Sequence, residues 1–263
     1  MEEKTNITVI LPIIELNEGL ENYFKNAILS ISEQLVKPDK VLIISKNDKE
    51  LLDKLKAYDY GTISSIVEVI VNDGKTDYCS QINYGVSKCN TEWVSILEID
   101  DEYSKIWFKN VVNYIKHENK DVYLPIIVDT DAEGRFIGFM NEAVWANEFS
   151  QVIGVVDNDA LMTYQNFNLC GSVFRKSLFT EFGGLKSNIK LTFIYEYLLR
   201  LTYNSAGVMV IPKIGYKHTN FRKDGLFDVY KNTISNDESA FWLETAKKEY
   251  FFDYDRDVLY EVK

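Results

Sequence analysis

Hydrophobic and polar positions change their spacing repeatedly along the first hundred residues, and this pattern predicts strands that alternate with helices. A β-branched run at 7–11, ended by Pro12, predicts a buried strand. Asn17 then precedes apolar residues at helical spacing, which predict an amphipathic helix. The same reasoning predicts strands at 41–44, 66–71 and 93–99 and helices at 49–58 and 78–89.

Strands that alternate with helices indicate an α/β protein with a mostly parallel, doubly wound sheet flanked by helices, a Rossmann-type arrangement. Ligands of such sheets bind beyond the carboxyl ends of the strands. Polar residues that follow the strands are therefore the first candidates for a functional site.

The second half of the chain is less regular. Gly183-Gly184 stops one short helix, and Ser235 with Glu238 forms a capping box ahead of the last one. We predict a main domain over 1–222 and a C-terminal helical extension over 223–263. The remaining predictions are strands at 122–128, 136–145 and 208–212 and helices at 177–182, 193–203 and 240–250.

Composition narrows the class of protein. The 263 residues, 46% of them hydrophobic, suffice for one large core, and the net charge of −11 argues against binding duplex nucleic acid through its phosphates. Three cysteines without a CxxC pair predict reduced thiols and a cytoplasmic protein. No apolar stretch approaches the roughly 20 residues of a membrane span, and no secretory leader follows Met1.

The most informative segment is an apolar run that ends in acid, at 92–102. In a strand, Glu98 and Asp100 share one face, and Asp101 follows directly. Crowded carboxylates repel one another unless a cation compensates them, so the pattern predicts a site for a divalent metal ion. The alternative is a strand that runs into an acidic turn and the cap of the next helix.

The order of these features resembles the family-2-type glycosyltransferases of the GT-A fold, over residues 6–222. In that family an Asn-x-Gly motif precedes a strand that ends in Asp-x-Asp-Asp, and here Asn83, Gly85 and 98–101 keep that spacing. The segment 170–177, Gly183-Gly184, the run 198–201 and the segment 211–218 are similar to the acceptor half of the family in the same order.

The resemblance implies a nucleotide-sugar site at the carboxyl ends of the strands. Its metal, Mn²⁺ or Mg²⁺, is expected on Glu98 and Asp100, with help from Asp101 and from His218 in the C-terminal segment. The residues expected to contact the nucleotide-sugar are Pro12, Ile14, Glu15, Ser45, Asn47, Asn83, Glu98, Lys217 and Arg222.

Two departures from the family pattern affect specificity and catalysis. The Asp pair expected after the second strand is replaced by Ser45-Lys46-Asn47-Asp48, and the usual catalytic Glu-Asp pair is replaced by Phe193-Ile194. Glu196 is the candidate base that remains in that helix, although it lies four residues before Arg200 and could form only an ion pair there. Asp157, in the preceding loop, is the reserve candidate.

The predicted function is a metal-dependent, inverting glycosyltransferase that moves a sugar from a nucleotide-diphosphate donor, a UDP-sugar, to an acceptor hydroxyl. The acceptor class stays open among glycan, lipid, protein and modified base. One alternative is a nucleotidyltransferase, which would require a glycine-rich phosphate loop that the sequence lacks. The other is a noncatalytic nucleotide- or carbohydrate-binding module, which the replaced Glu-Asp pair supports.

Overall fold

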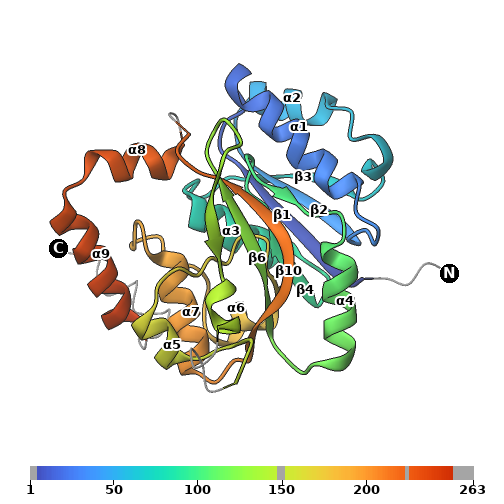
Figure 1. The fold of residues 1–263 in the computed structure, drawn as a ribbon. Coiled ribbons are helices and arrows are strands. Elements are labelled where there is room, and N and C mark those ends of the chain that lie inside the picture. Colours follow the sequence, from blue (N-terminus) through green and yellow to red (C-terminus); the bar gives the residue numbers. More distant parts are fainter. Residues whose placement is uncertain (1–4, 147–151, 223–224, 251–263) are drawn as a thin grey trace.

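The computed structural model describes residues 5–146, 152–222 and 225–250. Figure 1 shows a twisted sheet with helices on both of its faces, and the described part of the chain ends in two helices at one side of the molecule. The predicted α/β class is confirmed.

One sheet holds all strands of the described residues, in the order β3-β2-β1-β4-β9-β6-β10-β5, with β7 beside β6 and β8 beside β10. The strands are β1 (Ile7–Ile13), β2 (Lys40–Lys46), β3 (Val67–Asn72), β4 (Trp93–Ile96), β5 (Glu102–Tyr103), β6 (Val122–Thr130), β7 (Phe136–Met140), β8 (Val155–Val156), β9 (Val173–Arg175) and β10 (Val208–Thr219).

The sheet is parallel where the chain alternates regularly and mixed elsewhere. β1 pairs in parallel with β2 and β4, β2 with β3, and β6 with β10. The short strand β9 runs antiparallel between β4 and β6 and joins these two halves of the sheet. The carboxyl ends of β1, β2 and β4 therefore meet at one edge, which we call the carboxyl edge.

Two hydrophobic layers hold the helices on the sheet. One layer packs α1, α2 and α4 on the face that carries Val9 and Tyr123, and the other packs α3, α5, α6 and α7 on the face that carries Ile10 and Leu124. The helices are α1 (Glu18–Ser32), α2 (Lys49–Ala57), α3 (Tyr78–Lys88), α4 (Trp107–His117), α5 (Asn158–Thr163), α6 (Ser177–Glu181), α7 (Phe193–Tyr203), α8 (Leu226–Thr233) and α9 (Asn236–Glu249), with short 3₁₀ turns at Gly61–Ile63 and Glu142–Trp145.

Several elements differ from the sequence prediction. The strand predicted at 136–145 ends at Met140 and is followed by a 3₁₀ turn at Glu142–Trp145, and the short elements β5, β8, β9 and α5 were not predicted. β4 ends at Ile96 instead of residue 99, and β10 continues past Pro212 to Thr219 with register shifts on either side of Ile214. Proline has no N–H for a sheet hydrogen bond, so strands pass it through such irregularities. Helix α4 lies in a stretch to which the sequence pattern assigned no element.

The C-terminal extension packs against the main body. α9 contacts α7, the buried Lys186 donates a hydrogen bond from Nζ to the carbonyl of Glu249, and Thr192 donates one to the carbonyl of Trp242. The predicted boundary at residue 222 stays a prediction, and residues 251–263 of the extension lie outside the described residues.

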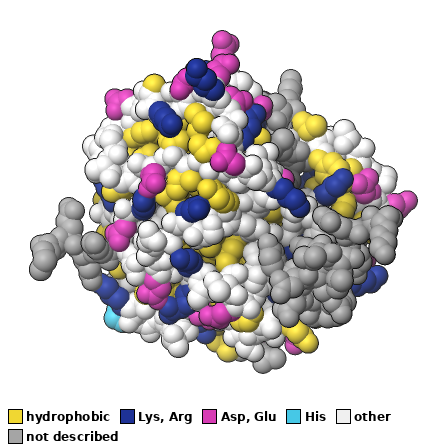
Figure 2. All heavy atoms as spheres, turned by 180° about the vertical axis from the view of Figure 1, so that it is seen from behind, with side chains coloured by type: hydrophobic (Ala, Val, Ile, Leu, Met, Phe, Trp, Pro, Cys, Tyr) yellow, Lys and Arg dark blue, Asp and Glu magenta, His cyan; other side chains and the backbone are white. Residues whose placement is uncertain are grey.

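The surface seen from behind carries charges of both signs (Figure 2). Lysine and arginine side chains lie among aspartate and glutamate, and hydrophobic side chains form patches between them. None of the described helices is long and apolar enough to cross a membrane.

Candidate active site at the carboxyl edge

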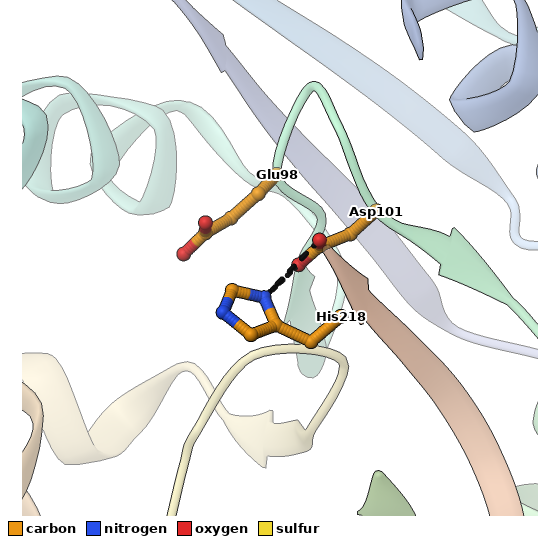
Figure 3. Close-up of side chains that lie close together, drawn as sticks. All are labelled: Glu98, Asp101 and His218. Atoms are coloured by element: carbon orange, nitrogen blue, oxygen red, sulfur yellow. Dashed lines mark hydrogen bonds and ion pairs between the residues drawn. The ribbon is translucent and has the colours of Figure 1, made fainter. Parts of the chain in front are cut away.

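Two carboxylates and an imidazole converge where β4 ends. After Ile96 the chain turns, with the amide of Asp101 donating to the carbonyl of Glu98 at 3.3 Å, and β5 then pairs with β10. This turn brings Glu98 and Asp101 to His218 of β10, so that one ligand atom of each lies within 4.8 Å of the other two. Figure 3 shows the three side chains pointing toward one another.

The imidazole of His218 is held by Asp101. Nδ1 lies 2.9 Å from Oδ2 and 3.1 Å from Oδ1 of Asp101, and the amide of Thr219 donates to Oδ1 at 2.9 Å. Burial alone lowers the pKa of His218, but Asp101, Glu98 and Asp129 outweigh it and raise the pKa to about 10. Without a metal ion, His218 is therefore a cation at neutral pH.

Glu98 is fixed by donors from α3 and from the loop before β9. Its Oε1 accepts hydrogen bonds from the Tyr78 hydroxyl and from the Cys170 thiol, both at 2.8 Å. Burial raises the pKa of Glu98, the nearby Asp101 raises it further, and His218 lowers it. A buried carboxylate of this kind favours a cation beside it.

Asp100 does not converge with Glu98 in the way that strand alternation predicts, because β4 has already ended. Its Oδ2 lies 3.2 Å from Nε of Arg222 instead. Burial and the charge of Glu98 raise the pKa of Asp100 to about 6, although Arg222 and His218 lower it. Of the four residues predicted to bind metal, the structure thus brings three together and pairs the fourth with arginine.

A cavity opens beside this cluster, and we call it the edge cavity. It encloses about 120 Å³. Several predicted nucleotide-sugar and metal residues line it, together with Tyr78 and with Asp228 of α8. The predicted residues in its wall are Pro12, Ile14, Glu15, Glu98, Asp100, His218 and Arg222.

Ser45, Asn47 and Lys217 are placed outside this wall. Ser45 is buried and donates its hydroxyl to the carbonyl of Lys46, and Asn47 is exposed after the end of β2. Lys217 lies 2.6 Å from Glu102 through its Nζ.

Asn83 has a local structural role. Its side-chain amide donates to the carbonyl of Leu185 and accepts from the amide of Leu185, both at 2.8 Å. Gly85, the second residue of the Asn-x-Gly motif, lets α3 approach the sheet, since a Cβ there would lie 2.7 Å from Ile10. In this motif Asn83 therefore holds the loop at Leu185, and Gly85 allows α3 to pack closely on the sheet.

Glu196 lies in a buried ionic network away from the edge cavity. It has no exposed surface, and its two oxygens lie 3.2 Å from Nζ of Lys186 and 2.9 Å from Nη2 of Arg200. Arg200 also donates to the carbonyls of Phe182 and Gly184. In this arrangement a buried cation lies beside each carboxylate oxygen of Glu196.

Asp157 also lies far from the cluster. It caps α5 by accepting a hydrogen bond from the amide of Ala160 at 2.7 Å. It follows β8, whose Val156 pairs with Val208 at the start of β10, whereas His218 lies near the end of that strand. Over this stretch of β10 the partner strand β6 advances only from Val122 to Asp129, so at about 3.3 Å per residue the two sites are roughly 20 Å apart, and the structure does not bring Asp157 to the site.

Sequence reasoning missed the side chains that hold the cluster in place. Tyr78 carried no signal beyond its position at the start of a helix. Cys170 belongs to a motif that the family resemblance did include, and Gly171 beside it adopts φ +72° against the ring of Tyr216. The Cys170-Gly171 pair was therefore the sequence feature that could have pointed to this part of the site.

Solved structures share this architecture. The chain matches S. aureus TarS residues 1–349 with UDP (TM-score 0.59, 15% identity, 98% of this chain and 75% of that one). It matches the complex with UDP-GlcNAc similarly (TM-score 0.60, 15% identity, 98% and 76%). The fold and the acidic carboxyl edge thus define the chain as a GT-A-like protein.

The sequence comparison names the family. Residues 8–181, two thirds of the chain, match the profile of glycosyl transferase family 2, and the chain belongs to this family of glycosyltransferases. The resemblance inferred from the motifs is confirmed. No curated protein sequence matches the chain.

Proposed function

We propose that the protein transfers a sugar from a UDP-sugar to an acceptor hydroxyl, with inversion at the anomeric carbon and with the help of a divalent metal ion. The observation that carries this proposal is the convergence of Glu98, Asp101 and His218 beside the edge cavity of a family 2 glycosyltransferase. The UDP and UDP-GlcNAc complexes of TarS, a protein of similar fold, support the choice of donor.

The residues of the cluster fit Mn²⁺ or Mg²⁺. Two carboxylates and one imidazole supply oxygen and nitrogen ligands, and their spacing within 4.8 Å allows one ion to contact all three. The proton on His218 and the metal ion compete for the same cluster of Glu98, Asp101 and His218. When bound, the ion stabilises the negative charge that develops on the diphosphate as the sugar bond breaks.

Other residues of the edge cavity bind and orient the donor in this proposal. Pro12, Ile14 and Glu15 at the end of β1 flank the nucleoside, with Ser45 and Asn47 beyond them at the end of β2. Arg222 lies in the cavity wall, where its guanidinium faces the carboxylate of Asp100. In this proposal the guanidinium is a second cation for the diphosphate, because arginine forms strong hydrogen bonds with phosphate oxygens.

The test is release of UDP from a panel of UDP-sugars in the presence of Mn²⁺ and, separately, of EDTA. We expect at least one UDP-sugar to be turned over with Mn²⁺ and turnover to be lost with EDTA. Metal-dependent UDP binding without turnover of any nucleotide-sugar would instead favour a noncatalytic binding module. Equal turnover with Mn²⁺ and EDTA would contradict the metal assignment.

A further inference from the structure

A second cavity lies directly beside the edge cavity, and we call it the Tyr230 cavity. The loop after Lys186 contributes Ser187 and Lys190, and α8 contributes Tyr230. Tyr78 lines both cavities, and its hydroxyl donates to Glu98 at 2.8 Å. Tyr78 therefore links the Tyr230 cavity to the cluster at which the diphosphate is proposed to bind.

The wall of the Tyr230 cavity combines aromatic rings with polar groups. Tyr78 and Phe193 pack with their ring centroids 5.6 Å apart, and Nζ of Lys190 lies 5.2 Å from the ring centroid of Tyr230. Such a wall suits a carbohydrate, which presents apolar C–H faces and hydroxyl groups together. The Tyr230 cavity has a volume of about 230 Å³.

Asp77 supplies the carboxylate of this cavity, and no other acidic residue of the described chain lines it. The side chain is exposed and caps α3, accepting hydrogen bonds from the amide of Ser80 at 3.0 Å and from its hydroxyl at 2.6 Å. Each carboxylate oxygen accepts one of these bonds, so each keeps a lone pair for another donor.

We propose that the Tyr230 cavity binds a carbohydrate acceptor and that Asp77 is the general base of the transfer. This inference rests on the proposed function. It gives the base role to a residue of the cavity next to the donor site, since Glu196 is enclosed by Lys186 and Arg200.

In the proposed step the carboxylate of Asp77 takes the proton of the acceptor hydroxyl. The acceptor oxygen forms a bond to the anomeric carbon, and the bond between that carbon and the diphosphate oxygen breaks. The electron pair of the broken bond stays on the UDP that leaves. The products are the glycosylated acceptor, UDP and a proton on Asp77.

Asp77→Asn tests the base role without removing the helix cap, because Asn and Asp are about equally good at the N-cap position. Asp48→Asn is the matched control, since Asp48 caps α2 through the amide of Leu51 at 3.1 Å. We would measure UDP release from the UDP-sugar with Mn²⁺, with water and with a panel of methyl glycosides as acceptors, and UDP affinity in parallel.

We expect Asp77→Asn to slow both reactions on the order of 10²–10⁴-fold with UDP affinity unchanged, and Asp48→Asn to have little effect. Wild-type rates in Asp77→Asn would overturn the base role and leave the proposed function intact. Absence of turnover in the wild type would overturn both.

Ser187→Trp tests the acceptor site, because Ser187 is exposed on the rim and a large side chain there fills the cavity. We expect one or more methyl glycosides to accelerate UDP release in the wild type, and Ser187→Trp to abolish this acceleration while hydrolysis and UDP affinity persist. Acceleration that survives in Ser187→Trp would place the acceptor elsewhere. If no methyl glycoside accelerates UDP release from the wild type, the assignment of a carbohydrate acceptor to this cavity is overturned.

Discussion

The contact between His218 and Asp101 decides how the site behaves without metal. The charges of Asp101, Glu98 and Asp129 raise the pKa of His218 despite its burial, and Asp101 is fully buried. A protonated imidazole and a metal ion compensate the same negative charge. In the proposed function, a proton on His218 therefore stabilises the cluster when no metal is bound, and a metal ion that binds at neutral pH would displace that proton.

In protein treated with EDTA, we expect His218→Gln to lower the free energy of unfolding by about 3 kcal/mol near pH 7, because it leaves a buried carboxylate uncompensated. The folded pKa of His218, about 10, exceeds its ordinary value of 6.5. The contribution is therefore complete below the unfolded pKa and is lost as pH rises through the folded one. Urea unfolding at pH 6 to 10.5 measures it.

His117→Gln is the control for that series, since His117 is exposed in the last turn of α4. Its effect on stability should stay small at every pH. A deficit for His218→Gln that does not shrink toward pH 10.5 would contradict the assignment of a protonated His218.

The residues of the acidic run were predictable, but their individual roles were not. Strand alternation would pair Glu98 with Asp100, and this holds only while the strand continues. β4 ends at Ile96, and the turn that follows presents Asp101 to His218 and leaves Asp100 for Arg222. The end of a strand depends on tertiary contacts, here the pairing of β5 with β10, which a local pattern does not contain.

At the scale of elements, helix α7 holds the candidate base Glu196 in a buried ionic network. Glu196 bridges Lys186 and Arg200, and Arg200 in turn holds the carbonyls of Phe182 and Gly184. Lys186 also reaches Glu249 at the end of α9. The network therefore ties α7 to the loop before it and to the C-terminal helix.

We expect Glu196→Gln to destabilise the fold by about 3 kcal/mol, because two buried cations lose their counter-charge, and to leave UDP release per folded molecule within a few-fold of the wild type. Thermal unfolding and turnover at 20 °C measure the two effects. Glu244→Gln, at an exposed position of α9 3.9 Å from Lys247, is the matched control. If Glu196→Gln loses turnover without losing stability, Glu196 is the catalytic base.

Regular elements followed from the sequence and irregular ones did not. α1 begins after Asn17 and α9 after Ser235, as their capping residues predict. The three-residue strand β9 gave no periodic signal, because its place between β4 and β6 comes from pairing with both neighbours. Helix α4 did carry apolar residues at helical spacing, including Trp107, Phe108 and Val111, but no capping side chain marks its start.

At the scale of the whole molecule, the sheet joins the two halves of the site. Glu98 comes from the first, regular half of the chain, and His218 comes from a strand that enters the sheet more than a hundred residues later. The C-terminal extension closes the same region, since α8 lines both the edge cavity and the Tyr230 cavity. Donor binding should therefore stabilise the entire fold, not one lobe of it.

The most direct test of the central claim is the melting temperature of the protein with UDP, measured with Mn²⁺ and with EDTA. A ligand that binds only the folded state stabilises it by about 2.7 kcal/mol at one hundred times its dissociation constant, which raises the melting temperature by several degrees. We predict this shift with Mn²⁺, little shift with EDTA, and its loss in Glu98→Gln. Equal shifts with Mn²⁺ and EDTA, or an unaltered shift in Glu98→Gln, would contradict a metal-diphosphate site at Glu98, Asp101 and His218.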